Sequence, residues 1–277
     1  MGAVRALPGA GALGAEVLDL DLAADLDAET VAALMAALAE HQVLFFNHQR
    51  LTPQTLLALG RKLGALSAHP AYAHPEVPEV ARLEHTREKP SKIELWHTDM
   101  TYLQAPPLGS MLCAEILPPA GGDTLFSSSS AAYEALSAPL QRLLDGLTAE
   151  HSFAHGFKES LAEAAPDSPL WEAVRRNPPV RHPVVRVHPV TGRKGLFVNP
   201  LFTTRICELT ASESAVLLPY LWQHAVAPEF TCRFRWSPGA VAFWDNRATL
   251  HRPINDYGFT HRRMFRITVA GDRPFGP

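Results

Sequence analysis

The first part of the chain alternates between patterns typical of strands and of helices. In residues 18–22 three leucines alternate with two aspartates, which is the period of a half-buried strand. Asp27 follows as a candidate N-cap, and apolar residues at helical spacing over 31–38 predict an amphipathic helix. The run Val43-Leu44-Phe45-Phe46 then predicts a short buried strand.

Further helix signals flank a long irregular segment. Thr52, which precedes a proline, predicts an N-cap, and Gly64 predicts the end of that helix. Residues 67–91 are rich in Pro and His, so we expect mostly irregular backbone there. A segment of this length in a compact domain is more often functional than idle. Helical patterns also cover residues 133–147 and 212–224, and prolines punctuate the loops between them.

The remaining apolar stretches are short and typical of strands. The sequence shows no internal repeat, no regular alternation of strands with helices and no glycine-rich phosphate loop. Many short strands with a few helices favour an antiparallel barrel or sandwich with helical cover, which is a mainly β fold. The strand-like stretches are 111–113, 184–187, 196–198, 241–244 and 265–269.

Composition favours one globular domain and argues against several function classes. The chain has 277 residues, 47% hydrophobic and 19% charged, with a formal net charge of -3. A single core of about 250 residues is feasible, so we expect one domain over residues 1–277. Lys and Arg form no basic block, so nucleic acid is not an expected partner. No stretch approaches the roughly 20 uncharged apolar residues of a membrane-spanning helix.

The expected compartment follows from the N-terminus and the cysteines. The first 14 residues lack the order of segments found in a secretory signal peptide. Cys113, Cys207 and Cys232 are far apart and form no C-x-x-C pair, which argues against disulfides and a cysteine-bound zinc ion. We therefore expect a cytoplasmic protein.

The segment Trp96-His97-Thr98-Asp99 carries the first chemical signal. Residues two apart in a strand share a face, so the His97 imidazole and the Asp99 carboxylate can converge on one point. These groups suit a divalent first-row metal, and a second histidine would complete the triad of non-haem Fe(II) oxygenases. The tripeptide alone is weak evidence because the chain has 13 histidines. The candidate third ligand is His251, just after a predicted core strand.

A second signal is a pair of arginines near the C-terminus. If the segment is a strand, Arg262 and Arg266 lie on one face, while Phe265 and Ile267 lie on the other. The apolar face can pack under helices, which would place both guanidinium groups inside a barrel. Buried like charges are costly unless each meets an anion. The pattern therefore predicts that two anionic ligands bind inside the barrel.

Several spaced motifs in this order resemble the Fe(II)/2-oxoglutarate-dependent TauD/TfdA family, and its taurine dioxygenases in particular. The resemblance covers most of the chain and is densest between residues 96 and 275. It implies a double-stranded β-helix, or jelly roll, with α-helices packed around it. The matching segments are Trp96-His97-Thr98-Asp99, Gly121-Gly122-Asp123-Thr124-Leu125, His182-Pro183-Val184-Val185-Arg186, Phe197-Val198-Asn199 with Phe202-Thr203-Thr204-Arg205, Trp244-Asp245-Asn246-Arg247 with His251, and the Arg262/Arg266 pair.

The same resemblance implies a role for each matching polar residue. His97, Asp99 and His251 would be the catalytic ligands of Fe(2+). Arg262 would hold the distal carboxylate of 2-oxoglutarate, helped by the Thr124 hydroxyl, with O2 as the other cosubstrate. Arginine fits this role because its planar fork can grip a carboxylate through two parallel bonds.

The resemblance further implies a pocket for a small anionic substrate. Arg266 would hold the anionic head of that substrate. His69, Tyr72, Phe157 and Phe202 match residues that line the pocket of the taurine enzymes. Members of the family often assemble as dimers or tetramers, so a homo-oligomer is expected.

The implied reaction is hydroxylation of a small organosulfonate such as taurine, releasing an aldehyde and sulfite with succinate and CO2. Before Trp96, however, the taurine enzymes carry a run rich in Asn and Asp, where this chain has Lys92-Ile93-Glu94-Leu95. Ile93 would bury an ammonium group poorly, whereas Glu94 compensates only if its side chain turns inward rather than toward solvent. Alkylsulfonates or alkyl sulfate esters are therefore the alternative, and a carboxylate substrate is a more remote one.

Taken singly, these residues also have ordinary explanations. Thr124 could be a turn hydroxyl, the two arginines could be solvated strand charges, and the aromatic residues could be core packing.

Two protein classes other than an oxygenase also have to be weighed. A catalytically inactive jelly-roll binding module should have lost a metal ligand, whereas this chain keeps all three. A zinc hydrolase would not need Arg262 and Thr124 beside the metal. A halogenase is disfavoured because Asp99 is present. The ordered set of motifs favours the dioxygenase.

Overall fold

The computed structural model describes residues 4–9, 11–67, 73–258 and 260–277. This part of the chain contains a seven-stranded sheet that forms one wall of the molecule. Its neighbouring strands are antiparallel except for the second and third, which pair in parallel. In spatial order the strands are β1 (Arg5–Pro8), β2 (Ala15–Leu18), β3 (Val43–Phe46), β13 (Val241–Asp245), β5 (Gly109–Ile116), β15 (Arg262–Val269) and β4 (Ala81–His85).

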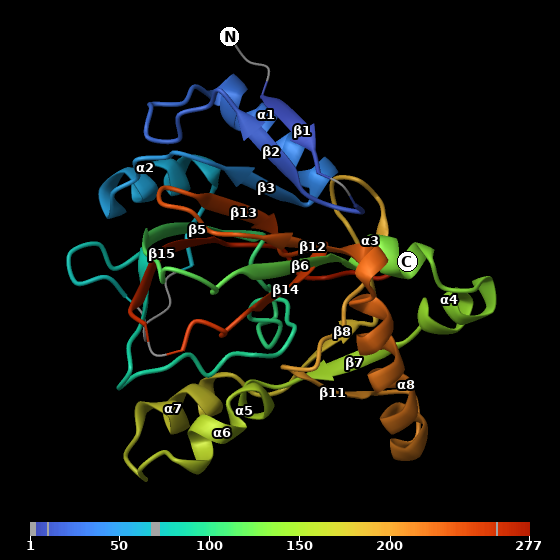
Figure 1. Ribbon diagram of the computed structural model, residues 1–277. Helices are drawn as coiled ribbons and strands as arrows, with labels where there is room; N and C mark the ends of the chain where they lie inside the picture. The colour runs from blue at the N-terminus through green and yellow to red at the C-terminus, as the bar shows by residue number, and fades with distance from the viewer. Residues whose placement is uncertain (1–3, 10, 68–72, 259) are drawn as a thin grey trace.

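A three-stranded sheet, formed by residues 124–128, 231–234 and 249–253, lies beneath the large sheet in the view of Figure 1. Phe126 and Phe234 from this sheet pack in one cluster with Trp244 and Met264 from the large sheet. The two sheets thus enclose an apolar interior, which confirms the predicted mainly β jelly-roll core. The remaining strands, in spatial order within each sheet, are β12 (Thr231–Phe234), β6 (Thr124–Ser128) and β14 (Thr249–Pro253); β11 (Thr203–Ile206), β7 (Thr148–His151) and β8 (Val180–Pro183); and β10 (Lys194–Leu196) with β9 (Val185–Val187).

Helices cover the sheets, as predicted. The first two pack on the outer face of the large sheet through one buried cluster that contains Leu34, Leu56 and Ile267. Within the described residues, no helix is both long enough and apolar enough to cross a membrane. The helices are α1 (Ala28–His41), α2 (Pro53–Leu63), α3 (Ser129–Glu134), α4 (Ala138–Leu144), α5 (Phe153–Gly156), α6 (Lys158–Ala162), α7 (Pro169–Arg176), α8 (Ala211–Ala225) and the 3-10 helix η2 (Pro228–Phe230).

The predicted helix boundaries near the N-terminus are confirmed. The Asp27 carboxylate accepts a hydrogen bond of 2.8 Å from the Thr30 backbone N–H at the start of α1. Thr52 caps α2, because its side chain and backbone exchange hydrogen bonds with Thr55. Gly64 ends α2 with a φ of 153°, a conformation that favours glycine. Each cap satisfies backbone groups that the helix itself leaves free.

The predicted alternation along β15 is also confirmed. Phe265, Ile267 and Val269 belong to the cluster beneath α1 and α2. Met264 instead belongs to the cluster between the two sheets. The residues that share the Met264 face, including both arginines, therefore point into the barrel.

Some element boundaries differ from the prediction. The strand expected over 18–22 ends at Leu18, because Asp19 adopts a left-handed backbone with φ 59°. The segment 67–91 contains an edge strand, β4, which is stabilised by pairing with β15. The helix expected over 133–147 is two helices, α3 and α4, separated by residues 135–137. The segment between the helical patterns 133–147 and 212–224, expected to form loops punctuated by prolines, contains α7. This helix begins at Pro169 because proline fits the first helical turn.

Candidate metal and cosubstrate site

The segment that carries His97 and Asp99 is docked along β14. The His97 N–H donates to the His251 carbonyl at 2.9 Å, and the His251 N–H donates to the His97 carbonyl at 2.8 Å. The Thr98 hydroxyl adds a bond of 2.8 Å to the Thr249 carbonyl. Directly opposed residues of an antiparallel pair project side chains from the same face, so the two imidazoles lie together with ring centroids 4.2 Å apart.

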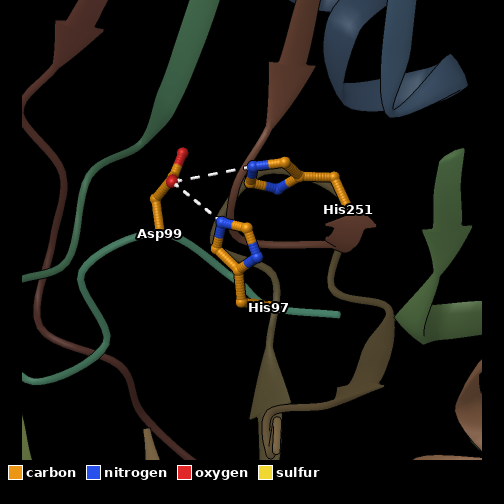
Figure 2. Close-up of side chains that lie close together, drawn as sticks. All are labelled: His97, Asp99 and His251. Carbon is orange, nitrogen blue, oxygen red and sulfur yellow. Dashed lines mark ion pairs between the residues drawn. The ribbon is translucent and has the colours of Figure 1, made fainter. Parts of the chain in front are cut away.

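His97, Asp99 and His251 converge on one buried point, as Figure 2 shows. The Nε2 atoms of His97 and His251 lie 3.8 Å and 3.7 Å from Asp99 Oδ1. All three candidate ligand atoms lie within 4.8 Å of one another. Nitrogen and oxygen ligands bind a first-row metal at about 2.0–2.2 Å, so one ion placed between these atoms can reach all three. The geometry therefore fits the metal triad predicted from the sequence.

Both imidazoles are held in the neutral form that binds a metal. Burial lowers the pKa of His97, and it lowers the pKa of His251 well below the ordinary value. His97 Nδ1 lies 2.9 Å from the Leu95 carbonyl, which accepts a hydrogen bond when that nitrogen carries the proton. This tautomer leaves the Nε2 lone pair directed at the centre of the site.

The two oxygens of the Asp99 carboxylate have different neighbours, which fixes the orientation of the group. Oδ2 lies 2.7 Å from Arg266 Nη2 and accepts a hydrogen bond of 3.2 Å from Ser110. Oδ1 faces the two imidazoles. Burial by itself would raise the pKa of Asp99, but the positive charge of Arg266 outweighs it and the net pKa is lowered. The carboxylate is therefore ionised, with Oδ1 available to a metal.

Asn246, which the sequence motifs contained without a role, fixes the backbone of Asp99. Its Oδ1 accepts a hydrogen bond of 2.8 Å from the Asp99 N–H, and its Nδ2 donates to the Asp99 carbonyl at 3.0 Å. Nδ2 also donates to the Pro107 carbonyl at 3.2 Å. Because Asn246 lies in the loop between β13 and β14, this amide ties Asp99 to the segment that leads into the strand of His251.

We expect Asn246→Ala to weaken Mn(II) binding by about 10- to 100-fold, the usual cost of losing a group that orients a metal ligand. The change leaves the backbone groups of Asp99 without their partner, so its carboxylate is no longer fixed opposite the imidazoles. Competition with a chromophoric chelator measures the affinity. Asn199→Ala is the matched control, because Asn199 is equally buried and its amide also makes three hydrogen bonds. An equal loss of affinity in both variants would assign Asn246 to general stability.

The guanidinium group of Arg262 is buried without an anionic partner among the described residues. Its Nε has no hydrogen-bond partner among the described residues, and none of their carboxylates pairs with it. Nη2 makes only a long contact of 3.5 Å with the Gly122 carbonyl, and the guanidinium lies 5.9 Å from the centre of the Tyr257 ring. Burial lowers the pKa of Arg262, yet a guanidinium stays charged in proteins. The arrangement fits a carboxylate guest.

Arg266 has a different environment from Arg262. It contacts Asp99 as described, and Nη2 also donates to Ser110 Oγ at 2.9 Å. Its Nε is buried without a partner among the described residues. The structure therefore places Arg266 beside the triad, with one donor still free for an anion.

Phe157 and Phe202 belong to an aromatic cluster just beyond the triad. Both rings contact Tyr102, at centroid distances of 6.4 Å and 5.1 Å, and the cluster includes Met100. Met100 follows Asp99 with a left-handed φ of 51°, which turns the chain from the triad into this cluster. His69 and Tyr72, also expected in the pocket, lie outside the described residues.

The segment before Trp96 offers little to an ammonium group. Glu94 is exposed, so its side chain does not turn inward. The Ile93 carbonyl accepts a hydrogen bond of 3.0 Å from Asn255 Nδ2. Of the two orientations left open for Glu94 by the sequence, the structure shows the one that faces solvent.

Comparison with known proteins identifies relatives over nearly the whole chain. Residues 3–268 match the model of the family described as taurine catabolism dioxygenase TauD, TfdA family. The chain is 37% identical to an alpha-ketoglutarate-dependent sulfate ester dioxygenase of Pseudomonas putida, with 97% of this chain and 90% of that protein covered.

Solved structures give the same result for the fold. A taurine dioxygenase from Burkholderia xenovorans is 37% identical, with a TM-score of 0.84 over 99% of this chain and 93% of that one. The structure of AAD-2 in complex with Mn(II) and N-oxalylglycine is 28% identical, with a TM-score of 0.83 over 98% of this chain and 99% of that one.

Proposed function

Given that the chain belongs to the TauD/TfdA family and is a 2-oxoglutarate-dependent dioxygenase using Fe(II) and O2, we propose that it oxidises a small organic sulfonate or sulfate ester. One observation carries the proposal. A neutral-imidazole and carboxylate triad shares the barrel interior with two arginines, each of which has a buried donor without a partner among the described residues. Two anions, one cosubstrate and one substrate, would satisfy them.

We assign the roles within this reaction as follows. His97, Asp99 and His251 would hold Fe(II), which when bound would couple the oxidative decarboxylation of 2-oxoglutarate to oxygenation of the substrate. Arg262 and Thr124 hold the distal carboxylate of 2-oxoglutarate. This assignment is supported by the buried, unpaired guanidinium of Arg262 and by the position of Thr124 on the strand next to β14.

Arg266 orients the anionic head of the primary substrate. Its bond to Asp99 Oδ2 holds the guanidinium beside the triad, and its free Nε can donate to a sulfonate or sulfate oxygen. The carbon next to that anion is then held near the metal. Its hydroxylation gives a product that collapses to an aldehyde, with sulfite leaving from a sulfonate and sulfate from a sulfate ester.

The surroundings favour a substrate with an alkyl group and no amine. Phe157, Phe202 and Met100 supply apolar surface next to the Asp99 segment. Neither the Ile93 side chain nor the exposed Glu94 is available to an ammonium group. A sulfate ester as substrate is also consistent with the name of the Pseudomonas putida relative.

A substrate panel tests this preference. We expect kcat/KM for hexyl sulfate or pentanesulfonate to exceed that for taurine by about 10-fold or more, because a pocket without polar partners disfavours a buried ammonium. Sulfate or sulfite release and succinate formation are measured together, so that uncoupled turnover is recognised. A higher kcat/KM for taurine would refute the preference, and activity confined to carboxylates would refute the sulfonate or sulfate assignment.

The cytosol is the proposed site of this activity. Cys113, Cys207 and Cys232 are all free thiols, and two of them are at least partly exposed. Free cysteines suit a reducing compartment. Activity recovered in a periplasmic or secreted fraction instead would contradict this.

A further inference from the structure

The hydroxyl of Thr124 receives a hydrogen bond whose direction is fixed. Trp236 Nε1 lies 3.0 Å from Thr124 Oγ1, and both residues are buried. An indole N–H can only donate, so the threonine oxygen must accept. We propose that Trp236 is a positioning residue for the cosubstrate: it holds the Thr124 hydroxyl so that its proton points at the distal carboxylate of 2-oxoglutarate. This inference rests on the proposed role of Thr124.

The remaining proton of Thr124 is available to a ligand. Along β6, Thr124 shares a face with Phe126, whose ring lies 6.2 Å from that of His251. The hydroxyl therefore faces the barrel interior. Among the described residues, no acceptor takes its proton. With one lone pair used by the indole, donation toward the interior is the contact that remains open.

Arg262 lies beside the segment that leads into Thr124. Two residues before Thr124, the Gly122 carbonyl contacts Arg262 Nη2 at 3.5 Å. Gly122 has a φ of 75°, and a Cβ there would lie 3.5 Å from Arg262 Nε and 3.3 Å from Tyr257. A side chain would crowd this space, so the glycine keeps it open. A carboxylate bound beside Gly122 would meet the guanidinium group of Arg262, and under the proposed role of Thr124 it would also accept a hydrogen bond from the threonine hydroxyl.

The indole itself is firmly held. Trp236 packs edge-on against Phe234 with centroids 4.9 Å apart, and Phe234 stacks on Phe45 at 4.3 Å. Phe234 is also the register partner of Thr124 in the β12–β6 pair. The same aromatic stack thus fixes both ends of the hydrogen bond. A hydroxyl oriented before binding spares the ligand the cost of ordering it.

A double-mutant cycle separates this role from simple packing. The variants are Trp236→Phe, which keeps an apolar ring but removes the N–H, Thr124→Val, and the two combined. Calorimetry measures 2-oxoglutarate binding to the Mn(II)-loaded proteins. We expect Trp236→Phe to weaken binding about 3- to 10-fold and Thr124→Val about 10-fold. The combined variant should bind no more weakly than Thr124→Val alone, because the indole acts only through that hydroxyl.

Each outcome is informative. Unchanged affinity in Trp236→Phe, or losses that multiply in the combined variant, would overturn the role of Trp236 while leaving that of Thr124 intact. Wild-type affinity in Thr124→Val would instead overturn the proposed cosubstrate contact. Trp222→Phe is the matched control, because its buried indole nitrogen has no partner among the described residues. It should leave 2-oxoglutarate affinity unchanged, and Mn(II) affinity should be unchanged in Trp236→Phe.

Discussion

Replacing His97, Asp99 or His251 by alanine is expected to abolish substrate-dependent succinate formation, with kcat/KM falling by about 10³-fold or more, or at least ~4 kcal/mol. Each side chain supplies one of three ligand atoms that lie within 4.8 Å of one another. Removing one leaves two ligands, which cannot fix the position of the ion or of the groups bound to it. Succinate release and Mn(II) affinity are the measurements.

A partly buried histidine outside the triad provides the control for these variants. His224 lies in α8, where its Nε2 is 2.7 Å from the Ala132 carbonyl. His224→Ala should retain Mn(II) binding, even where it lowers the thermal denaturation midpoint. Turnover close to wild type in any of the three triad variants would remove that residue from the metal site.

Arg262→Ala is expected to raise the apparent KM for 2-oxoglutarate by about 10- to 150-fold, the value of a lost charge-assisted contact of about 1.5–3 kcal/mol. The guanidinium is buried and has no carboxylate partner among the described residues, so the cosubstrate is its natural anion. Steady-state kinetics with varied 2-oxoglutarate at saturating primary substrate gives the value.

The neighbouring arginines make this prediction specific. Arg266→Ala should mainly weaken the primary substrate and increase uncoupled decarboxylation. Arg263→Ala is the control from the opposite face of β15, where Arg263 pairs with Glu84 and Glu115 outside the barrel. If Arg262→Ala weakened the primary substrate while Arg266→Ala weakened 2-oxoglutarate, the two assignments would have to be exchanged.

Local signals in the sequence were sufficient for several parts of the fold. The caps at Asp27 and Thr52 were predictable because their hydrogen bonds join residues three positions apart. The two faces of β15 were predictable because side chains alternate strictly along a strand. By contrast, β4 was missed because its stability comes from pairing with β15, which is distant in sequence.

For the candidate site, too, some features were predictable from the sequence and others depend on the tertiary structure. The residue types and order of the motifs predicted the convergence of His97, Asp99 and His251, and the alternation in β15 predicted two inward guanidiniums. The orientation of Asp99 could not be predicted, because its neighbours Arg266 and Asn246 are brought to it only by the closed barrel. Likewise, Thr124 and its indole donor are 112 residues apart in sequence. The sequence determined which groups carry the chemistry, and the tertiary structure decided which atom of each group faces the metal or the cosubstrate, because those contacts join strands that no local pattern pairs.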